Sequence, residues 1–232
     1  MTILGIDTSS AACSCALLKD GKLLGETLVN SGLTHSETIM PAVSALLERE
    51  NLAPKDVDVF AVAAGPGSFT GVRIGVCAVK ALAEACKKPC ARVDALWAIA
   101  EGSAWEGLIC PILDARRDQV YTALFRRKGT VLSRVREDAA LCLDELITAL
   151  KDEAAVYFTG DGLNSYETRL KEAMGDRALI APAHIRVLRA SALCRAAEID
   201  PDSWMSADRL TPMYLRLPQA ERERNARLSA KP

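Results

Sequence analysis

The residues with the clearest chemical potential lie in one glycine-rich segment, GPGSFTGVRIG, which runs from Gly65 to Gly75. It follows the apolar run 57–64 and leads into a helix-like stretch, 76–86. A glycine turn between a strand and a helix presents free backbone N–H groups and a positive helix end to an anion. No Gly-Lys-Ser/Thr follows, so this is not a Walker loop, and a turn that only packs a helix on a sheet is the alternative reading. The candidate phosphate contacts are Gly65, Gly67, Ser68, Thr70 and Gly71.

The rest of the sequence offers few residues that could bind a metal or act as reactive thiols. His35 and His184 are the only histidines, and none of the eight cysteines forms a CxxC pair, which argues against a zinc knuckle or a thioredoxin-type centre. We therefore expect no metal site, and for His35 a place at a helix start or in an interface. Scattered cysteines in apolar segments favour reduced thiols in a cytoplasmic protein. Met1 is followed directly by TILGID and the apolar runs are strand-sized, which predicts neither a leader nor a membrane span.

Around the glycine-rich segment, the hydrophobic pattern predicts alternating strands and helices. The Asp20-Gly21 pair predicts a hairpin, and the apolar period changes from two residues to 3.6 residues at Ser36. In the first half we expect strands at 2–7, 13–19, 23–30, 57–64 and 90–94, and helices at 36–50, 72–86 and 95–103. In the second half we expect strands at 107–114, 120–127, 131–137 and 155–162, helices at 143–152, 163–174 and 190–199, and an extended segment at 208–218.

Both halves run as a strand meander followed by alternating helices and strands. This order predicts an α/β fold of two lobes, each a mixed sheet flanked by helices. We expect the boundary near 103–108, with an N-terminal lobe at 1–105 and a C-terminal lobe of related architecture at 106–232. The net charge of −1 gives the whole chain no pull toward nucleic acid.

Three motifs carry a resemblance to a known family. The strand and turn LGIDTSS, which contains Asp7, Thr8 and Ser9, resembles the first phosphate loop of the actin/hexokinase/Hsp70-like (ribonuclease H-like) fold. Together with GPGSFTGVRIG and the closing YLR at 214–216, it makes the chain look like a member of the TsaB (YeaZ) family. The similarity spans essentially the whole chain.

The resemblance implies a role in N6-threonylcarbamoylation of adenosine 37 in tRNAs that read codons beginning with A. In that pathway the paralogue TsaD, which binds metal and nucleotide, is the transferase, and a small ATPase, TsaE, completes the assembly. A TsaB-like chain is implied to be a non-catalytic subunit that binds and activates TsaD, that pairs with a second copy in isolation, and that meets tRNA through the complex. No cofactor of its own is implied, and ATP or ADP is expected only at an interface shared within the complex.

The residues agree with a subunit that lacks catalytic groups. The TsaD branch carries an HxxxH metal pair, and Ala95 and Ile99 align with its two positions, where neither side chain can bind a metal. Asp7 is expected either to keep a phosphate contact or only to cap a turn. Asp114 is the candidate for a general base or only closes a strand. The residues implied to form vestigial nucleotide or phosphate loops are Asp7, Thr8, Ser9, Gly65, Gly67, Ser68, Thr70, Gly71, Gly160 and Gly162.

If the chain has no catalytic activity of its own, its function must depend on a surface that binds another molecule. The resemblance assigns the TsaD contact to the helices 36–50 and 72–86, whose apolar stripes permit such a contact, although part of each stripe must face the chain's own sheet. On this basis charged residues at Val43 and Val76 are expected to weaken the complex without unfolding the monomer. The residues expected at the interface are Ile39, Met40, Val43, Leu46, Leu47, Val72, Val76, Val79, Leu82 and Ala83.

Two other classes of function stay open. An ATP-dependent phosphotransferase of the same fold would use Asp7, the glycine loops and Asp114. A peptidase has less support, because the sequence shows no HxxxH motif, no serine–histidine–carboxylate set and no reactive cysteine context. Direct contact with tRNA also stays open, through Arg126, Arg127 and Lys128 or through a basic tail with Arg216, Arg222, Arg224, Arg227 and Lys231, although a solvated end is the favoured reading of that tail.

Overall fold

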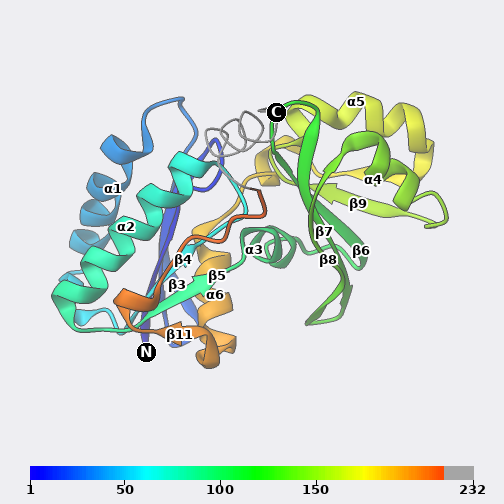
Figure 1. Ribbon diagram of the computed structural model, residues 1–232. Coiled ribbons are helices and arrows are strands. Elements are labelled where there is room, and N and C mark those ends of the chain that lie inside the picture. The colour runs from blue at the N-terminus through cyan, green and yellow to red at the C-terminus, as the bar shows by residue number, and fades with distance from the viewer. Residues whose placement is uncertain (217–232) are drawn as a thin grey trace, which may run out of the picture.

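The computed structural model describes residues 1–216 and shows two α/β lobes side by side (Figure 1). Each lobe is built on one sheet, and helices flank both sheets. The two-lobed α/β architecture expected from the sequence is therefore confirmed. The tail residues Arg222, Arg224, Arg227 and Lys231 lie outside the described residues.

The first lobe contains a six-stranded mixed sheet in the order β11-β5-β4-β1-β2-β3. The central strand β1 pairs antiparallel with β2 and parallel with β4, and every residue of β1 is buried. Asp20 and Gly21, both with positive φ, form the tight turn between β2 and β3, as the sequence predicts. The strands are β1 (Thr2–Asp7), β2 (Cys13–Lys19), β3 (Lys22–Val29), β4 (Val59–Ala63), β5 (Cys90–Val93) and β11 (Trp204–Met205).

Two pairs of helices cover the two faces of this sheet. The helices α1 (His35–Arg49) and α2 (Phe69–Cys86) bury their apolar stripes in one core with Leu4, Ile6 and Phe60. On the other face lie α3 (Ala95–Glu101) and α6 (Ala190–Ile199). The helix α2 begins three residues earlier than predicted, because the side chain of Ser68 caps its first turn.

The second lobe contains a five-stranded sheet in the order β10-β9-β6-β7-β8. Its strands are β6 (Gly107–Asp114), β7 (Gln119–Lys128), β8 (Val131–Cys142), β9 (Val156–Thr159) and β10 (Ala178–Ile180), and its helices are α4 (Leu143–Ala149) and α5 (Leu163–Met174). One-turn 3-10 helices connect elements across the chain at Pro54–Asp56, Gly175–Arg177, Ala183–Ile185, Pro201–Ser203 and Ala207–Arg209.

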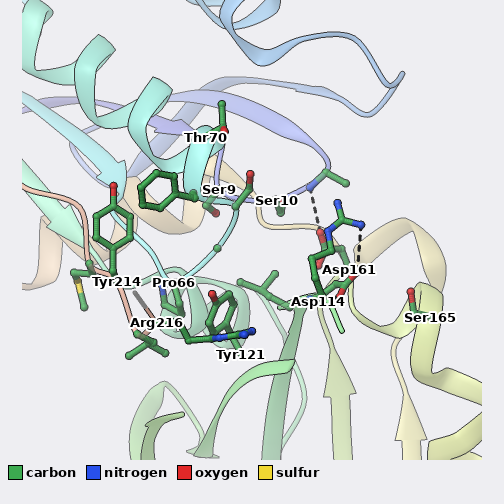
Figure 2. Close-up of a pocket in the computed structure, with 18 of the residues that line it drawn as sticks. Ser9, Ser10, Pro66, Thr70, Asp114, Tyr121, Asp161, Ser165, Tyr214 and Arg216 are labelled. Atoms are coloured by element: carbon green, nitrogen blue, oxygen red, sulfur yellow. Dashed lines mark hydrogen bonds and ion pairs between the residues drawn. The ribbon is translucent and has the colours of Figure 1, made fainter. Parts of the chain in front are cut away.

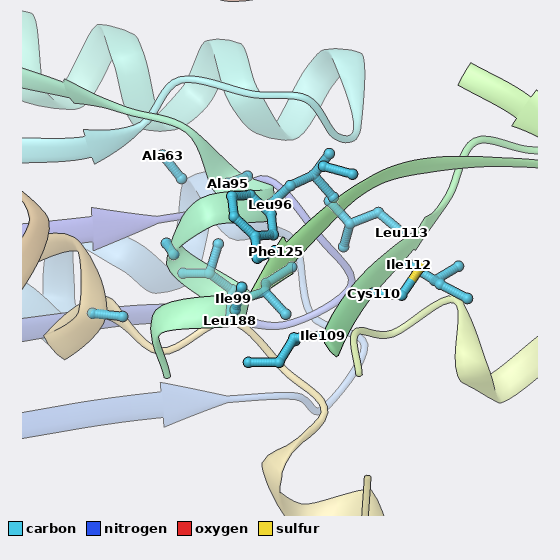
Figure 3. Packing of buried hydrophobic residues seen from close by; sticks show 14 of the residues in the cluster. Ala63, Ala95, Leu96, Ile99, Ile109, Cys110, Ile112, Leu113, Phe125 and Leu188 are labelled. Atoms are coloured by element: carbon cyan, nitrogen blue, oxygen red, sulfur yellow. The ribbon is translucent and has the colours of Figure 1, made fainter. Parts of the chain in front are cut away.

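One hydrophobic core continues from the first lobe into the second. The helix α3 lies between them, with Leu96 and Ile99 close to Phe125 and Ile109 of the second sheet (Figure 3). Arg127 of β7 strengthens this junction, since its guanidinium donates to the carbonyl oxygens at the end of α3 and pairs with Glu101 at 2.9 Å. This packed junction at α3 holds the two lobes together, and a buried Arg127 is not available to tRNA.

The boundary between the lobes differs from the predicted division into 1–105 and 106–232. The strand β11 pairs with β5, and α6 packs against β1 and β2, so the elements after about residue 190 return to the first sheet. The reason is topological: the helix α6 covers a face of the first sheet that α1 and α2 leave open. No helix within residues 1–216 is long and apolar enough to cross a membrane.

Candidate functional site

The glycine-rich segment packs against the turn that follows β1. The N–H of Ser68 donates to the carbonyl of Ser9 at 2.7 Å, and Thr8 Oγ1 donates to the carbonyl of Gly71, also at 2.7 Å. A Cβ at Gly67 would lie 2.3 Å from the Ser9 oxygen, and one at Gly71 would lie 2.0 Å from the Thr8 oxygen. Only glycine permits such close approach. The predicted loop residues are thus brought together, and these two glycines serve contact between loops.

The start of α2 still presents unused donors. Ser68 Oγ accepts the N–H of Gly71 at 3.3 Å, whereas the amides of Phe69 and Thr70 donate to no atom of the described residues. These amides belong to residues that line a cavity. Because the first turn of a helix carries partial positive charge, this end can accept an anionic group from a ligand.

Asp7 lies completely buried at the end of β1. Its Oδ1 accepts the N–H and the hydroxyl of Ser9 at 2.8 and 2.7 Å, which is the turn-capping arrangement expected as one alternative. No donor within residues 1–216 reaches its buried Oδ2. Burial raises the pKa of Asp7 to about 6, because its effect is larger than that of the two hydrogen bonds from Ser9, which lower the pKa.

This raised pKa predicts a pH-dependent stability. Because the folded-state pKa exceeds the usual value of 3.8, ionisation of Asp7 costs the folded state more than the unfolded state. The free energy of unfolding should therefore fall as the pH rises from about 4 through 6, by at most about 3 kcal/mol. In Asp7→Asn this component of the pH dependence should disappear, so the variant gains stability relative to wild type as the pH rises. Urea unfolding between pH 4.5 and 8 tests this, and parallel curves for the two proteins would contradict it.

Asp161 connects the second lobe to the first. Its Oδ2 accepts the N–H of Ala11 at 3.1 Å, and its buried Oδ1 meets no donor among the described residues. Burial raises the pKa of this carboxyl. The N–H of Gly162 donates to the carbonyl of Ile112 at 3.0 Å and holds the loop against β6. Sequence reasoning selected Gly160 and Gly162 and missed the aspartate between them, because the pattern GDG is typical of any tight turn.

Asp114 ends β6 and is held by its own turn. Its Oδ1 accepts the N–H of Arg116 at 2.7 Å, and its Oδ2 lies 3.7 Å from that guanidinium. Arg116, Arg117 and Asp118 all have φ between 56° and 64°, which is uncommon for residues with a Cβ. This turn places the Asp114 carboxylate at the cavity, where it can accept a hydrogen bond or a proton from a ligand.

These loops enclose a cavity of about 490 Å³ between the lobes (Figure 2). Its second-lobe wall includes the carboxylates of Asp114 and Asp161 beside Arg116, and the turn after β1 and the start of α2 form its first-lobe wall. A third wall, which sequence reasoning did not place here, is the C-terminal segment with Tyr214 and Arg216; it has no periodic pattern that could have marked it. The lining residues are Ser9, Ser10, Ala11, Pro66, Gly67, Ser68, Phe69, Thr70, Leu113, Asp114, Arg116, Tyr121, Asp161, Asn164, Ser165, Met213, Tyr214, Leu215 and Arg216.

The two positions that are expected from the sequence to align with a metal-binding pair are packing residues. Ala95 and Ile99 on α3 are buried in the core shared by the lobes. Within residues 1–216, no cluster of three or more histidine, cysteine, aspartate or glutamate side chains could hold a metal ion. His35 begins α1, and its Nε2 lies 2.8 Å from the carbonyl oxygen of Ser10, so it anchors the turn after β1 to the helix.

The predicted interface residues are mostly buried inside the chain, and this part of the prediction is wrong. The apolar stripes of α1 and α2 face the chain's own sheet, where no partner can reach them. The buried members are Ile39, Val43, Leu46, Leu47, Val72, Val76, Val79 and Ala83. Of the predicted set, Met40 is 40% exposed and Leu82 is half-buried.

The middle turns of α1 and α2 nevertheless carry few of the charges that solvent-facing helices normally have, because the exposed Glu37, Glu48 and Arg49 of α1 and Arg73 and Glu84 of α2 lie toward the helix ends. Between Arg73 and Glu84 of α2, the one charged side chain is that of Lys80, which is half-buried. We call the following exposed and half-buried residues the α1–α2 face: Met40, Pro41, Ser44, Ala45, Ile74, Cys77, Ala78, Ala81 and Leu82. Its small side chains would allow the helices of another protein to approach closely.

Comparisons with known proteins agree with this fold. A family model described as TsaD, tRNA N6-adenosine threonylcarbamoyltransferase, matches residues 30–221. The tRNA threonylcarbamoyladenosine biosynthesis protein TsaB of Bacillus subtilis (strain 168) is 37% identical over 223 residues, which cover 95% of this chain and 96% of the relative. The protein of the same name from Escherichia coli (strain K12) is 33% identical over 151 residues, 63% of this chain and 64% of the relative.

Solved structures show the same similarity. The structure of YeaZ from Pseudomonas aeruginosa aligns with a TM-score of 0.76 and 27% identity, covering 92% of this chain and 99% of that chain. A second crystal structure, of an uncharacterized protein with similarity to peptidase YEAZ from the same organism, gives a TM-score of 0.78 and 27% identity over 93% and 99% of the two chains. The two-lobed α/β architecture expected from the sequence is therefore shared with these solved structures.

Proposed function

The chain belongs to the TsaB (YeaZ) family, and from this membership we propose that it is a non-catalytic subunit of tRNA threonylcarbamoyladenosine biosynthesis that binds and activates TsaD. In this role it supports threonylcarbamoyl transfer to N6 of adenosine 37 in tRNAs that read codons beginning with A. TsaE joins the same assembly, tRNA is met through the complex, and ATP or ADP binds only at an interface shared within it. The setting we propose is the cytoplasm.

The observation that carries the proposal is the α1–α2 face. All the members of this face except Ser44 are apolar and none is charged, and an exposed apolar patch on a single chain marks a protein contact. A specific complex buries about 800 Å² of each partner, which two helices of 15 and 18 residues can supply. The same face would pair two copies when TsaD is absent. The packing residues Ala95 and Ile99, at the positions of a metal pair, support the assignment of the chemistry to the partner.

A charge on this face tests the contact. Ala81 is exposed on α2, so Ala81→Glu should leave the fold unchanged and weaken the TsaD complex by about tenfold or more, since an unpaired charge would be buried at the interface. Surface plasmon resonance and size-exclusion chromatography measure this. Ala154→Glu, the same change at an exposed position of the second lobe before β9, is the matched control. Equal affinity for the two variants would overturn the assigned surface.

Reconstitution tests the role itself. Threonylcarbamoyl transfer to tRNA by TsaD, TsaE and the upstream adenylate-forming enzyme should depend on this chain. Full activity without the chain would reject the proposed function, whatever the affinity of the complex.

An ATP-dependent phosphotransferase is the second candidate, and the interlobe cavity is the observation that favours it. The free amides of Phe69 and Thr70 and the carboxylate of Asp114 face the same space. Calorimetry of the isolated chain with Mg-ATP separates the two functions, because a phosphotransferase must bind nucleotide alone and the partner subunit need not.

A further inference from the structure

The segment 206–216, here called the strap, runs along α2 and then across the cavity (Figures 1 and 2). Its first part is anchored to α2. Ala207 and Leu210 are buried in the core beneath that helix, and Lys80 Nζ donates to the carbonyl oxygens of Asp208 and Leu210 at 3.4 and 3.2 Å. The single charge in the middle of α2 is therefore used to hold the strap.

The middle of the strap is attached to the start of α2. The ring of Tyr214 stacks on that of Phe69 with 4.8 Å between centroids, and Arg73 Nε donates to Tyr214 Oη at 2.8 Å. The Arg73 guanidinium also lies 3.8 Å from the centre of the Phe69 ring. Nearby, the N–H of Met213 donates to the carbonyl of Ala64 at 2.7 Å, which joins the strap to the residue just before the glycine-rich segment.

The end of the strap reaches the other lobe. Arg216 donates through a guanidinium nitrogen to the carbonyl oxygen of Ala115 at 2.9 Å. That carbonyl immediately precedes the left-handed turn that holds Asp114. One segment of eleven residues thus contacts the outer surface of α2, the first-lobe wall of the cavity and its second-lobe wall.

The strap also borders the partner surface. A surface groove of about 430 Å³ is lined on one side by Cys77, Lys80 and Ala81 of α2 and on the other by Ala207 and Asp208 of the strap. Cys77 and Ala81 belong to the α1–α2 face. A protein seated on that face would therefore touch the strap where Lys80 holds it.

We propose that the strap couples the α1–α2 face to the interlobe cavity, so that loosening it at Lys80 releases the second-lobe turn that Arg216 holds. The proposal rests on the proposed function only for the identity of the partner on α2. The packed α3 junction holds the two lobes together, which leaves the strap and the loops at the cavity as the part that can change. The coupling requires only two states of the strap, attached and released, and the contacts at Lys80 and at Arg216 both shift the equilibrium between them.

The coupling can be measured in the isolated chain by hydrogen exchange. In the second-lobe turn, the amides of Ala115 and Gln119 are protected by hydrogen bonds within that turn, and Lys80 lies on the other lobe. Lys80→Met should speed their exchange about fivefold to tenfold, as Arg216→Met does, because exchange follows local opening. The double variant should exchange no faster than the faster single variant, whereas independent sites would show multiplied effects.

Two controls separate a specific effect on the second-lobe turn from a general loss of stability. Lys55→Met, at an exposed position of the one-turn helix before β4, should leave the turn unchanged. Exchange of the β1 amides, measured in the same samples, reports global unfolding. If a variant speeds β1 exchange, Tyr214→Phe is used in its place. This substitution removes the hydroxyl that accepts from Arg73 and keeps the ring that stacks on Phe69. An unchanged second-lobe turn in Lys80→Met, beside faster exchange in Arg216→Met, would overturn the coupling.

A final arm uses TsaD as the probe. Binding should change exchange of the second-lobe turn in the wild-type chain and leave it unchanged in Arg216→Met. If TsaD does not bind the wild-type chain, the proposed function fails while the result in the isolated chain still stands. If TsaD binds and the turn responds equally in both proteins, the coupling fails and the proposed function stands.

Discussion

Gly71→Ala should destabilise the protein by about 3 kcal/mol or more. The new Cβ would lie 2.0 Å from the carbonyl oxygen of Thr8, a backbone atom that cannot rotate away. The two loops would have to separate, which also strains the 2.7 Å hydrogen bond between Thr8 Oγ1 and the Gly71 carbonyl. Urea unfolding followed by circular dichroism measures the loss of unfolding free energy. The dependence of that free energy on urea concentration shows whether the variant exposes the same surface on unfolding.

Gly102→Ala is the matched control for this prediction. Gly102 closes α3 with helical backbone angles, and the nearest atom to its new Cβ would be 3.5 Å away. Its stability should stay within about 0.5 kcal/mol of wild type. If glycine at position 71 served only to admit a phosphate, both variants would be equally stable, so equal unfolding midpoints would contradict the loop contact described above.

Much of the fold could be predicted because its elements are long and periodic. The expected helices at 163–174 and 190–199 match α5 and α6, and the helix at 36–50 matches α1 to within a residue at each end. The strands β10 and β11 contain three and two residues, which is too short for any period to show. The return of α6 and β11 to the first sheet also escaped prediction, because hydrophobic pattern does not say which sheet a helix covers.

The site was harder to predict than the fold because its residues meet only in three dimensions. Asp7 and the glycine-rich segment lie in sequence motifs, which is why the sequence singles them out as candidates. Asp161 meets Ala11 across 150 positions of sequence, and Arg216 meets Ala115 across 101. No local spacing encodes such pairs, which depend on how the lobes are joined.

Most residues predicted to form the partner surface are buried, and the error has a physical reason. A pattern search selects large apolar residues at helical spacing, and burial in the chain's own core selects the same residues. The α1–α2 face consists largely of alanine, cysteine, serine and proline, which add little to an apolar stripe. What distinguishes it is the absence of charge on exposed positions, and exposure is known only from the structure.

Val76→Asp separates the two interpretations of α2 and should unfold the protein. Val76 is 2% exposed and packs in the core between α2 and the first sheet, where an unpaired carboxylate has no solvent and leaves a poorly filled space. The loss should reach about 4 kcal/mol or more, a large share of the roughly 5–15 kcal/mol that stabilises a typical domain. Circular dichroism and urea unfolding of the isolated chain measure this without any partner.

Cys77→Asp, one position further along the same helix, is the control that gives the comparison its meaning. Cys77 is exposed on the α1–α2 face, so this variant should unfold at nearly the wild-type urea concentration and bind TsaD less tightly. The same charge is therefore expected to abolish folding at position 76 and to weaken only the binding of TsaD at position 77. A folded Val76→Asp that binds TsaD weakly would instead restore the apolar stripe as the interface, and would require α2 to be turned by about a third of a revolution from the orientation described here.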